Sequence, residues 1–301
     1  RQRQMCIRDS PWEMRIDMEN KKLNVKMIYT VIGIASLTVA FVCVVVLAVK
    51  QYRLWKSGQM YEKLAESTTV PSTTMPLEGD MDEGTTQELE GYKREAARLI
   101  TKYGIDVPEK NIDFDKLHNE ISEDIYAWIY IPNTHIDYPV FQHPDDNSYY
   151  LEHNIDGSEG YPGCIYTENY NAKDFSDPHT VIYGHNMRDT TMFSDLHLYE
   201  DEEFFENNRY VYIYTEDMVY VYKIFAAYQT NNAHQLLNYD FSQKETVKMY
   251  LENTAMRMQE PMVYDDTTAF SGDDQILTLS TCVMTERQFH LRYIVQSLRL
   301  K

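Results

Sequence analysis

Cysteine is scarce in this sequence. Only four occur in 301 residues, at Cys6, Cys43, Cys164 and Cys282. Cys43 falls inside an apolar run, where it behaves as a small hydrophobe, and Cys6 falls in an irregular leader. A single bridge between Cys164 and Cys282 is open, but a small fold held together by a disulfide framework is excluded.

Clustered metal ligands are also missing. The sequence contains neither a CxxC nor an HExxH pattern, the spacings that bring several ligands to one zinc ion. Nine histidines are present, and most of them lie in polar stretches. We therefore expect no metal site.

Positive charge is scarce beyond the N-terminal segment. The formal net charge of the whole chain is −19. Residues 1–56 carry ten Lys or Arg and four Asp or Glu, so the residues after them carry a net charge of −25. A body this acidic repels phosphate backbones, and nucleic acid is not an expected partner.

Charge of either sign is absent from Met27 to Val49, a run of 23 residues flanked by lysines. A helix of this length spans the ~30 Å hydrocarbon core of a bilayer, so the run predicts a transmembrane helix. A buried core helix is the first alternative, but such a helix is rarely apolar on every face. A cleaved signal peptide is the second, but its apolar region is usually ~7–15 residues long. The flanking basic residues are nearly balanced and do not decide the orientation.

Changes in composition divide the chain into four segments: a leader (1–26), the membrane helix (27–49), a flexible tether (50–86) and a folded domain (87–301). Residues 1–13 follow no structural pattern, and a native start at Met14 or Met18 is an alternative. The tether is rich in Thr, Ser, Pro and Gly from Ser67 onward, and an ordered surface loop is its alternative. Helical spacing from Gln87 to Tyr103 opens the folded domain.

Tyrosine is unusually frequent, with 25 residues, and it recurs with threonine and valine in short runs that favour strands. Two further stretches have helical spacing, Thr191–Leu198 and Ser242–Met258, with Ser242 as the expected N-cap. Many strands with few helices predict a mainly β, closed or nearly closed barrel. The expected strands are 125–131, 135–141, 163–168, 179–184, 209–215, 218–230, 275–281 and 292–298, with the fifth and sixth forming a hairpin.

Three residues of different chemistry stand at strand ends. Cys282 closes the run "LTLSTC", Arg292 opens the next run ten residues later, and His185 follows the strand "TVIYG". A cysteine nucleophile needs an acid–base partner and a group that stabilises developing negative charge. Taken singly, each has an ordinary structural explanation: a buried thiol, an exposed loop histidine and a solvated edge arginine.

Taken together, these pieces resemble the sortase family, and class B sortases in particular. The matching motifs are "VIYGHNM", "MFSDL", "LTLSTC", the arginine ten positions after the cysteine, and the opening pair "WIYIPNTHIDYPV". The resemblance runs from about Glu120 to Leu300. It implies a closed eight-stranded β-barrel with N-terminal helices and helical insertions. It also implies a single-pass membrane protein with a cytoplasmic N-terminus and an extracellular catalytic domain in a Gram-positive cell.

The resemblance further implies a cysteine transpeptidase. Cys282 would attack the threonine carbonyl of an NPxTx-like sorting signal on a secreted protein, and an amine of a cell-wall precursor or pilin would resolve the thioacyl-enzyme. His185 would protonate the leaving amine, and Arg292 would hold the oxyanion with its fixed fork of donors. No cofactor is expected, because amide and thioester exchange without ATP.

The neighbours of these residues are candidates for binding the substrate: Asn186, Ser280, Thr281 and Glu286. Some class B members carry an acidic residue two positions after the cysteine, where this chain has Met284, and Glu286 is a substitute. Arg287 rivals Arg292 but lies in the loop rather than at the head of the strand. Two other functions stay open: a membrane-tethered cysteine peptidase, and a non-enzymatic acidic ectodomain that binds a surface partner.

Overall fold

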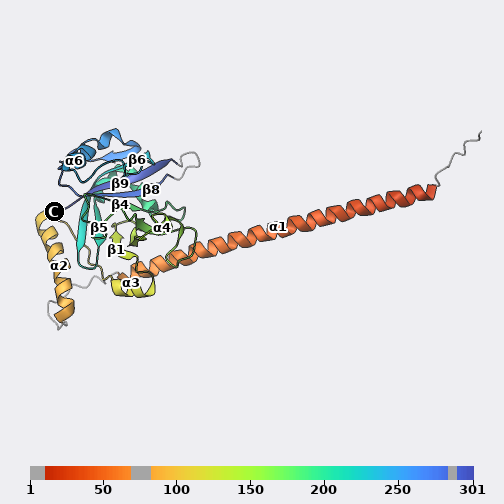
Figure 1. Cartoon of the computed structure of the whole chain (residues 1–301), viewed down its shortest axis with the longest axis horizontal. Coiled ribbons are helices and arrows are strands. Elements are labelled where there is room, and N and C mark those ends of the chain that lie inside the picture. Colours follow the sequence, from red (N-terminus) through yellow and green to blue (C-terminus); the bar gives the residue numbers. More distant parts are fainter. Residues whose placement is uncertain (1–10, 69–82, 284–289) are drawn as a thin grey trace, which may run out of the picture. The chain divides into compact units, whose positions relative to one another are not determined.

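The computed structural model describes residues 11–68, 83–283 and 290–301 (Figure 1). The chain divides into two compact units, Arg1–Trp55 and Lys56–Lys301. One helix, α1 (Pro11–Thr68), forms the described part of the first unit and continues into the second.

The apolar part of α1 is long and apolar enough to cross a membrane, judged by length and composition. None of its most apolar window is buried within the protein. The hydroxyls of Thr30, Ser36 and Thr38 each donate to a backbone carbonyl three or four residues earlier in the same helix. These polar side chains therefore need no partner from outside the helix, as a lipid environment requires.

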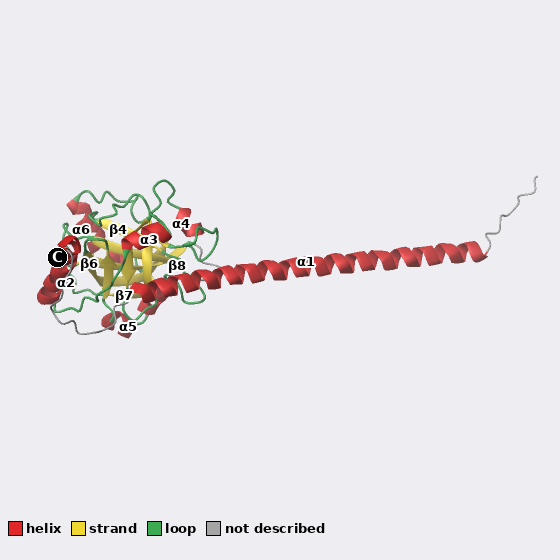
Figure 2. Ribbon diagram, turned by 90° about the horizontal axis from the view of Figure 1, so that it is seen from below, coloured by secondary structure: helices red, strands yellow, loops and turns green. Residues whose placement is uncertain are grey.

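The second unit is mainly β, with strands at its centre and short helices around them (Figure 2). Its helices are α2 (Glu83–Tyr103), α3 (Phe114–Glu120), α4 (Tyr149–Glu152), η1 (Ser194–Glu200), α5 (Glu202–Asn207), α6 (Lys244–Glu252) and η2 (Thr254–Met256). Its strands are β1 (Ile125–Tyr130), β2 (Asp137–Phe141), β3 (Ile165–Thr167), β4 (His179–Tyr183), β5 (Tyr210–Tyr214), β6 (Val219–Asn231), β7 (Gln259–Tyr264), β8 (Ile276–Cys282) and β9 (Leu291–Arg299).

Eight of these strands close into a barrel. The order is β5-β1-β2-β3-β4-β8-β9-β6, and β6 pairs back with β5 to complete the ring. The long strand β6 pairs with β9 along one edge, while β5 and then β7 pair with it in succession. The closed eight-stranded barrel is confirmed, and all eight predicted strands are found in it.

The strand β7 is missing from the prediction. Its sequence, "QEPMVY", includes Pro261, and its side chains are exposed or half-buried. It lies beyond the ring, paired only with β6 among the described strands. Proline is tolerated at a sheet edge, and an edge strand lacks the alternating apolar pattern that identifies the others.

The helix predictions need three corrections. The stretch Ser242–Met258 is divided into α6 and η2, and Gln243 rather than Ser242 is the N-cap. The Ser242 hydroxyl instead donates to Asp240 Oδ1 at 2.6 Å. Of the stretch Thr191–Leu198, only the part from Ser194 onward is helical, and it belongs to a 3₁₀ helix that ends at Glu200. The helices α3, α4 and α5 were not predicted, because they are too short to show a helical period in the sequence.

The predicted tether differs from the structure at its beginning. Residues 56–68 are helical, and Ser57, Tyr61 and Thr68 are buried. The backbone N–H of Asn111 donates to Thr68 O at 3.0 Å. The apolar side chains among these residues pack against the barrel core, which explains why this part is ordered. Residues 83–86 begin α2, and the rest of the predicted tether, 69–82, lies outside the described residues.

Candidate active site

Two neighbouring parallel strands, β4 and β8, run towards the same end of the barrel. Tyr183 stands beside Ser280 in the register, and the N–H of Gly184 donates to Ser280 O at 3.1 Å. His185 and Cys282 each follow two residues later. Parallel pairing in this register therefore brings a histidine and a cysteine 97 positions apart to one end of the barrel.

The next strand, β9, runs antiparallel to β8, and its register places Arg292 directly opposite Cys282. Side chains of directly opposite residues lie on the same face of a sheet, with Cβ atoms ~4.5–5.5 Å apart. The thiol and the guanidinium therefore share one face. The arginine at the start of β9 is thus placed beside the cysteine at the end of β8.

A cleft with a volume of about 190 Å³ contains all three side chains. Ser280 and Thr281 also line it, as does the segment Asn232–Gln235 after β6. Tyr166 and Tyr183, whose rings stack at 5.5 Å, form another part of the lining. The walls are thus aromatic and polar, and a peptide presents groups of both kinds.

His185 is held from several sides. Its Nε2 lies 2.9 Å from Leu151 O, and the ring of Tyr161 meets it edge-on at 4.9 Å. Burial lowers the pKa of His185, the hydrogen bond to Leu151 opposes this, and the charge of Arg292 lowers it further. The preceding Gly184 has no space for a side chain, because a Cβ there would lie 2.5 Å from Ile165 and 2.7 Å from Phe193.

The backbone carbonyl of Cys282 is anchored by two side chains. Asn186 Nδ2 donates to it at 2.9 Å, and His197 Nε2 lies 3.3 Å from it. The ring of His197 also stacks on Tyr293 at 4.7 Å. Asn186 follows His185, so one side chain links the histidine loop to the cysteine strand.

The comparison with known proteins decides the family. The model of the sortase domain matches residues 129–299, more than half of the chain. This chain belongs to the sortase family. Sortase B of Listeria monocytogenes is 31% identical over 255 residues, which cover 84% of this chain and 92% of that protein. Sortase B of Staphylococcus aureus is 27% identical over 163 residues, 54% of this chain and 65% of that protein.

Solved structures of class B sortases agree. Sortase B of Clostridium perfringens superposes with a TM-score of 0.54 at 31% identity, covering 63% of this chain and 100% of that chain. A complex of Staphylococcus aureus sortase B with substrate gives 0.55 at 25% identity, covering 73% and 99%. The present sortase is therefore a cysteine transpeptidase of the sortase B type.

Most of the residues that the sequence predicts for the sortase site line the cleft, but not all of them do. Cys282, His185, Arg292, Ser280 and Thr281 all line the cleft. Asn186 binds the Cys282 backbone. Met284, Glu286 and Arg287 lie outside the described residues.

Thr281 differs from the other predicted site residues. It is 2% exposed, and its hydroxyl has no hydrogen-bond partner in the described part of the chain. Its register partner is Tyr293, whose hydroxyl is equally without a partner there.

Sequence reasoning missed three polar residues of this site. His197 was not singled out among the histidines in polar stretches, although its position directly after the "MFSDL" motif is a usable signal. Glu168 accepts from Tyr183 Oη at 3.2 Å and lies 2.8 Å from His234 Nε2. Glu168 and His234 come from segments 66 positions apart, and no local pattern joins them.

Proposed function

We propose that this sortase cleaves an NPxTx-like sorting signal after its threonine and transfers the new carboxyl group to an amine. The observation that carries the proposal is the register of β8 and β9, which sets Cys282 opposite Arg292, with His185 at the end of the adjoining strand. A nucleophile, an acid–base group and a fixed cation then face one cleft.

The proposed reaction has two steps. The Cys282 thiolate attacks the threonine carbonyl, Arg292 donates to the resulting oxyanion, and His185 gives its proton to the departing amine. The acceptor amine then attacks the thioester carbonyl and loses a proton to His185. Collapse of this second tetrahedral intermediate breaks the C–S bond and releases the Cys282 thiolate. Burial lowers the pKa of His185, so the environment of the site disfavours its charged acid form.

The acceptor in this proposal is the amine of a cell-wall precursor or a pilin. A class B sortase of Streptococcus pyogenes that is involved in pilus biogenesis is 26% identical and superposes with a TM-score of 0.53, which supports the pilin as a candidate. The apolar segment of α1 supports a single-pass anchor. The proposal places the N-terminus in the cytoplasm and the barrel outside, because the substrates are secreted proteins.

The decisive experiment uses the full chain in detergent micelles with a fluorogenic NPxTx peptide, with and without an amine acceptor. Transfer to the amine, together with a thioacyl adduct on Cys282 in the mass spectrum, is the expected result. Hydrolysis that the amine does not divert would favour a peptidase. Binding of the peptide without cleavage would favour a non-enzymatic ectodomain, and a scrambled peptide is the control for both.

A further inference from the structure

Tyr61, in the part of α1 that belongs to the barrel unit, makes contacts that a membrane anchor does not require. The side chain is buried, at 4% exposure. Its hydroxyl donates to Gly163 O at 3.0 Å and lies 3.4 Å from Cys164 Sγ. A buried hydroxyl bonded to a backbone carbonyl fixes that carbonyl in place.

Gly163 in turn lies against the support of His185. Its φ is +67°, and a Cβ there would lie 2.8 Å from Tyr150 O, 2.9 Å from Leu151 O and 3.3 Å from His185 Cδ2. Leu151 O is the carbonyl that meets His185 Nε2. A shift of Gly163 would therefore disturb both the imidazole and the group that orients it.

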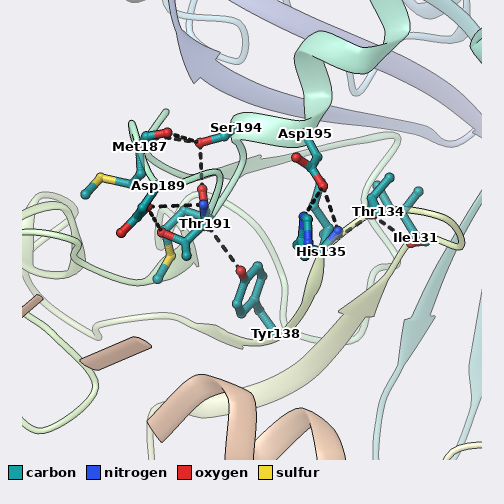
Figure 3. Close-up of polar contacts among 11 residues, drawn as sticks. Ile131, Thr134, His135, Tyr138, Met187, Asp189, Thr191, Ser194 and Asp195 are labelled. Carbon is teal, nitrogen blue, oxygen red and sulfur yellow. Dashed lines mark hydrogen bonds and ion pairs between the residues drawn. The ribbon is translucent and has the colours of Figure 1, made fainter. Parts of the chain in front are cut away.

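The ring of Tyr61 is also linked, through Tyr138, to the loop that follows His185. It packs edge-on against Tyr138 at 5.3 Å, and Tyr138 Oη accepts a hydrogen bond from Met192 N at 3.1 Å. Figure 3 shows Tyr138 pointing into the loop that contains Met187, Thr191 and Ser194.

Two backbone contacts join that loop to His185 and its neighbour Asn186. Phe193 N donates to His185 O at 2.9 Å, and Asn186 pairs with Met192. The backbone on the C-terminal side of His185 is therefore held by the same group of contacts that includes Tyr138 and the ring of Tyr61.

We propose that Tyr61 is a positioning residue for His185. Its hydroxyl supports Gly163, which lies against the imidazole, and its ring supports Tyr138 and the loop that binds the His185 backbone. The segment that leaves the membrane helix thus helps to set the geometry and the burial of His185. This inference rests on the proposed role of His185 in acyl transfer.

The test is Tyr61→Phe in the full chain in detergent micelles, assayed with the NPxTx peptide. We expect kcat to fall by about 10-fold with little change in KM, since misplacing a catalytic group by a fraction of an ångström slows the chemical step. We also expect the pKa of His185, read from the pH profile, to rise towards the ordinary histidine value as the loosened site admits water.

Tyr214→Phe is the matched control. Tyr214 is also buried, and its hydroxyl donates to a backbone carbonyl, that of Pro108, at 2.7 Å. This variant loses a bond of the same kind from a different part of the barrel. We expect it to lower the thermal stability without changing kcat or the pH profile.

If both variants lose stability equally and keep the wild-type kcat and pH profile, Tyr61 has only a structural role and the inference is overturned. If Tyr61→Phe does not fold, Tyr138→Phe tests the same support through the bond to Met192, and unchanged kinetics there would also overturn it. Failure of the wild type to cleave any signal peptide would instead refute the proposed function.

Discussion

At the scale of single residues, two cysteines of this domain have different chemistry because their surroundings differ. Cys164 and Cys282 are both free thiols. Cys164 is fully buried, and burial raises its pKa to about 12, although the hydrogen bond from Tyr61 opposes this. Cys282 is half-buried and faces the cleft. Only the thiolate of an accessible cysteine is a good nucleophile.

Alkylation should therefore distinguish the two thiols. Iodoacetamide is expected to modify Cys282 in the native protein and to modify Cys164 only after unfolding, as followed by peptide mass spectrometry. Cys282→Ala is the control and should remove the native-state label from the domain. Native labelling of Cys164 at an equal rate, or a Cys164–Cys282 disulfide in active enzyme, would contradict this.

Substitutions at Cys282, His185 and Arg292 should lower the activity to different degrees, according to the chemical role of each side chain. Cys282→Ala should abolish both cleavage and the acyl-enzyme, and His185→Ala should cost ~10²–10⁴-fold in kcat, the usual contribution of a general acid. Arg292→Lys keeps the charge but loses the planar fork, and we expect a loss of roughly 10²–10³-fold.

Arg299→Lys is the control for the arginine, because Arg299 lies at the opposite end of β9 and contacts Gln275 and the ring of Tyr220. It should leave kcat near the wild-type value. Full activity of Arg292→Lys would remove Arg292 from the mechanism, and full activity of Cys282→Ala would refute acyl transfer altogether.

A buried histidine outside the cleft should make the fold sensitive to acid. His179 is 2% exposed, and burial, assisted by the charge of Arg257, lowers its pKa to about 3. The unfolded chain binds this proton near pH 6.5 and the folded chain does not, so stability is lost as the pH falls below 6.5. The slope is ~1.4 kcal/mol per pH unit for one proton.

Urea unfolding at pH 7 and pH 5 measures this effect. The loss of unfolding free energy between the two should be about 2 kcal/mol larger in the wild type than in His179→Gln, since only the wild type gains that proton on unfolding. Equal losses in the two proteins would show that another group dominates.

At the scale of elements, three strand ends and one helix end build the site. Parallel pairing of β4 with β8 brings His185, two residues after β4, to the end of the barrel where Cys282 lies. Antiparallel pairing of β8 with β9 adds Arg292. The last part of α1 reaches the same region from outside the sheet through Tyr61 and Gly163. The site thus depends on an element that the composition alone assigns to a linker.

Removal of that helix end should weaken the fold. A chain that begins at Gln87 loses the buried Tyr61 side chain, worth about 1.5–3 kcal/mol, and the bond from Asn111 to Thr68. We expect its melting temperature to lie about 3–12 °C below that of a chain beginning at Lys56. Scanning calorimetry measures the difference, and equal melting temperatures would show that residues 56–68 add nothing to the fold.

At the scale of the whole molecule, the charge is strongly divided. Residues 1–56 are basic overall, and the rest carries a net charge of −25. The apolar segment of α1 lies within the basic part. An acidic body with a basic, apolar N-terminal segment suits a protein that is held at a membrane surface.

Protease shaving tests the proposed topology. In intact Gram-positive cells that produce the full chain, trypsin in the medium should release most of the body beyond Lys56 as immunoreactive fragments. A cytoplasmic marker protein is the control for cell integrity. Complete protection of the residues after Lys56, with cleavage only after lysis, would contradict an extracellular domain.

Local sequence patterns were sufficient to predict one part of this protein. Runs of β-formers identified the eight barrel strands, an uncharged run identified the apolar helix, and short motifs singled out Cys282, His185 and Arg292. These signals are local because side-chain alternation and hydropathy are read over a few neighbouring residues.

Which distant segments meet depends on the tertiary packing. The pairing of β4 with β8, the packing of Tyr61 under Gly163, the anchoring of Cys282 O by His197 and the contact of Glu168 with His234 join residues 66 to 102 positions apart. Such contacts form when the barrel closes and buries apolar surface. No local period encodes them, because the free energy that selects them comes from the whole packed core.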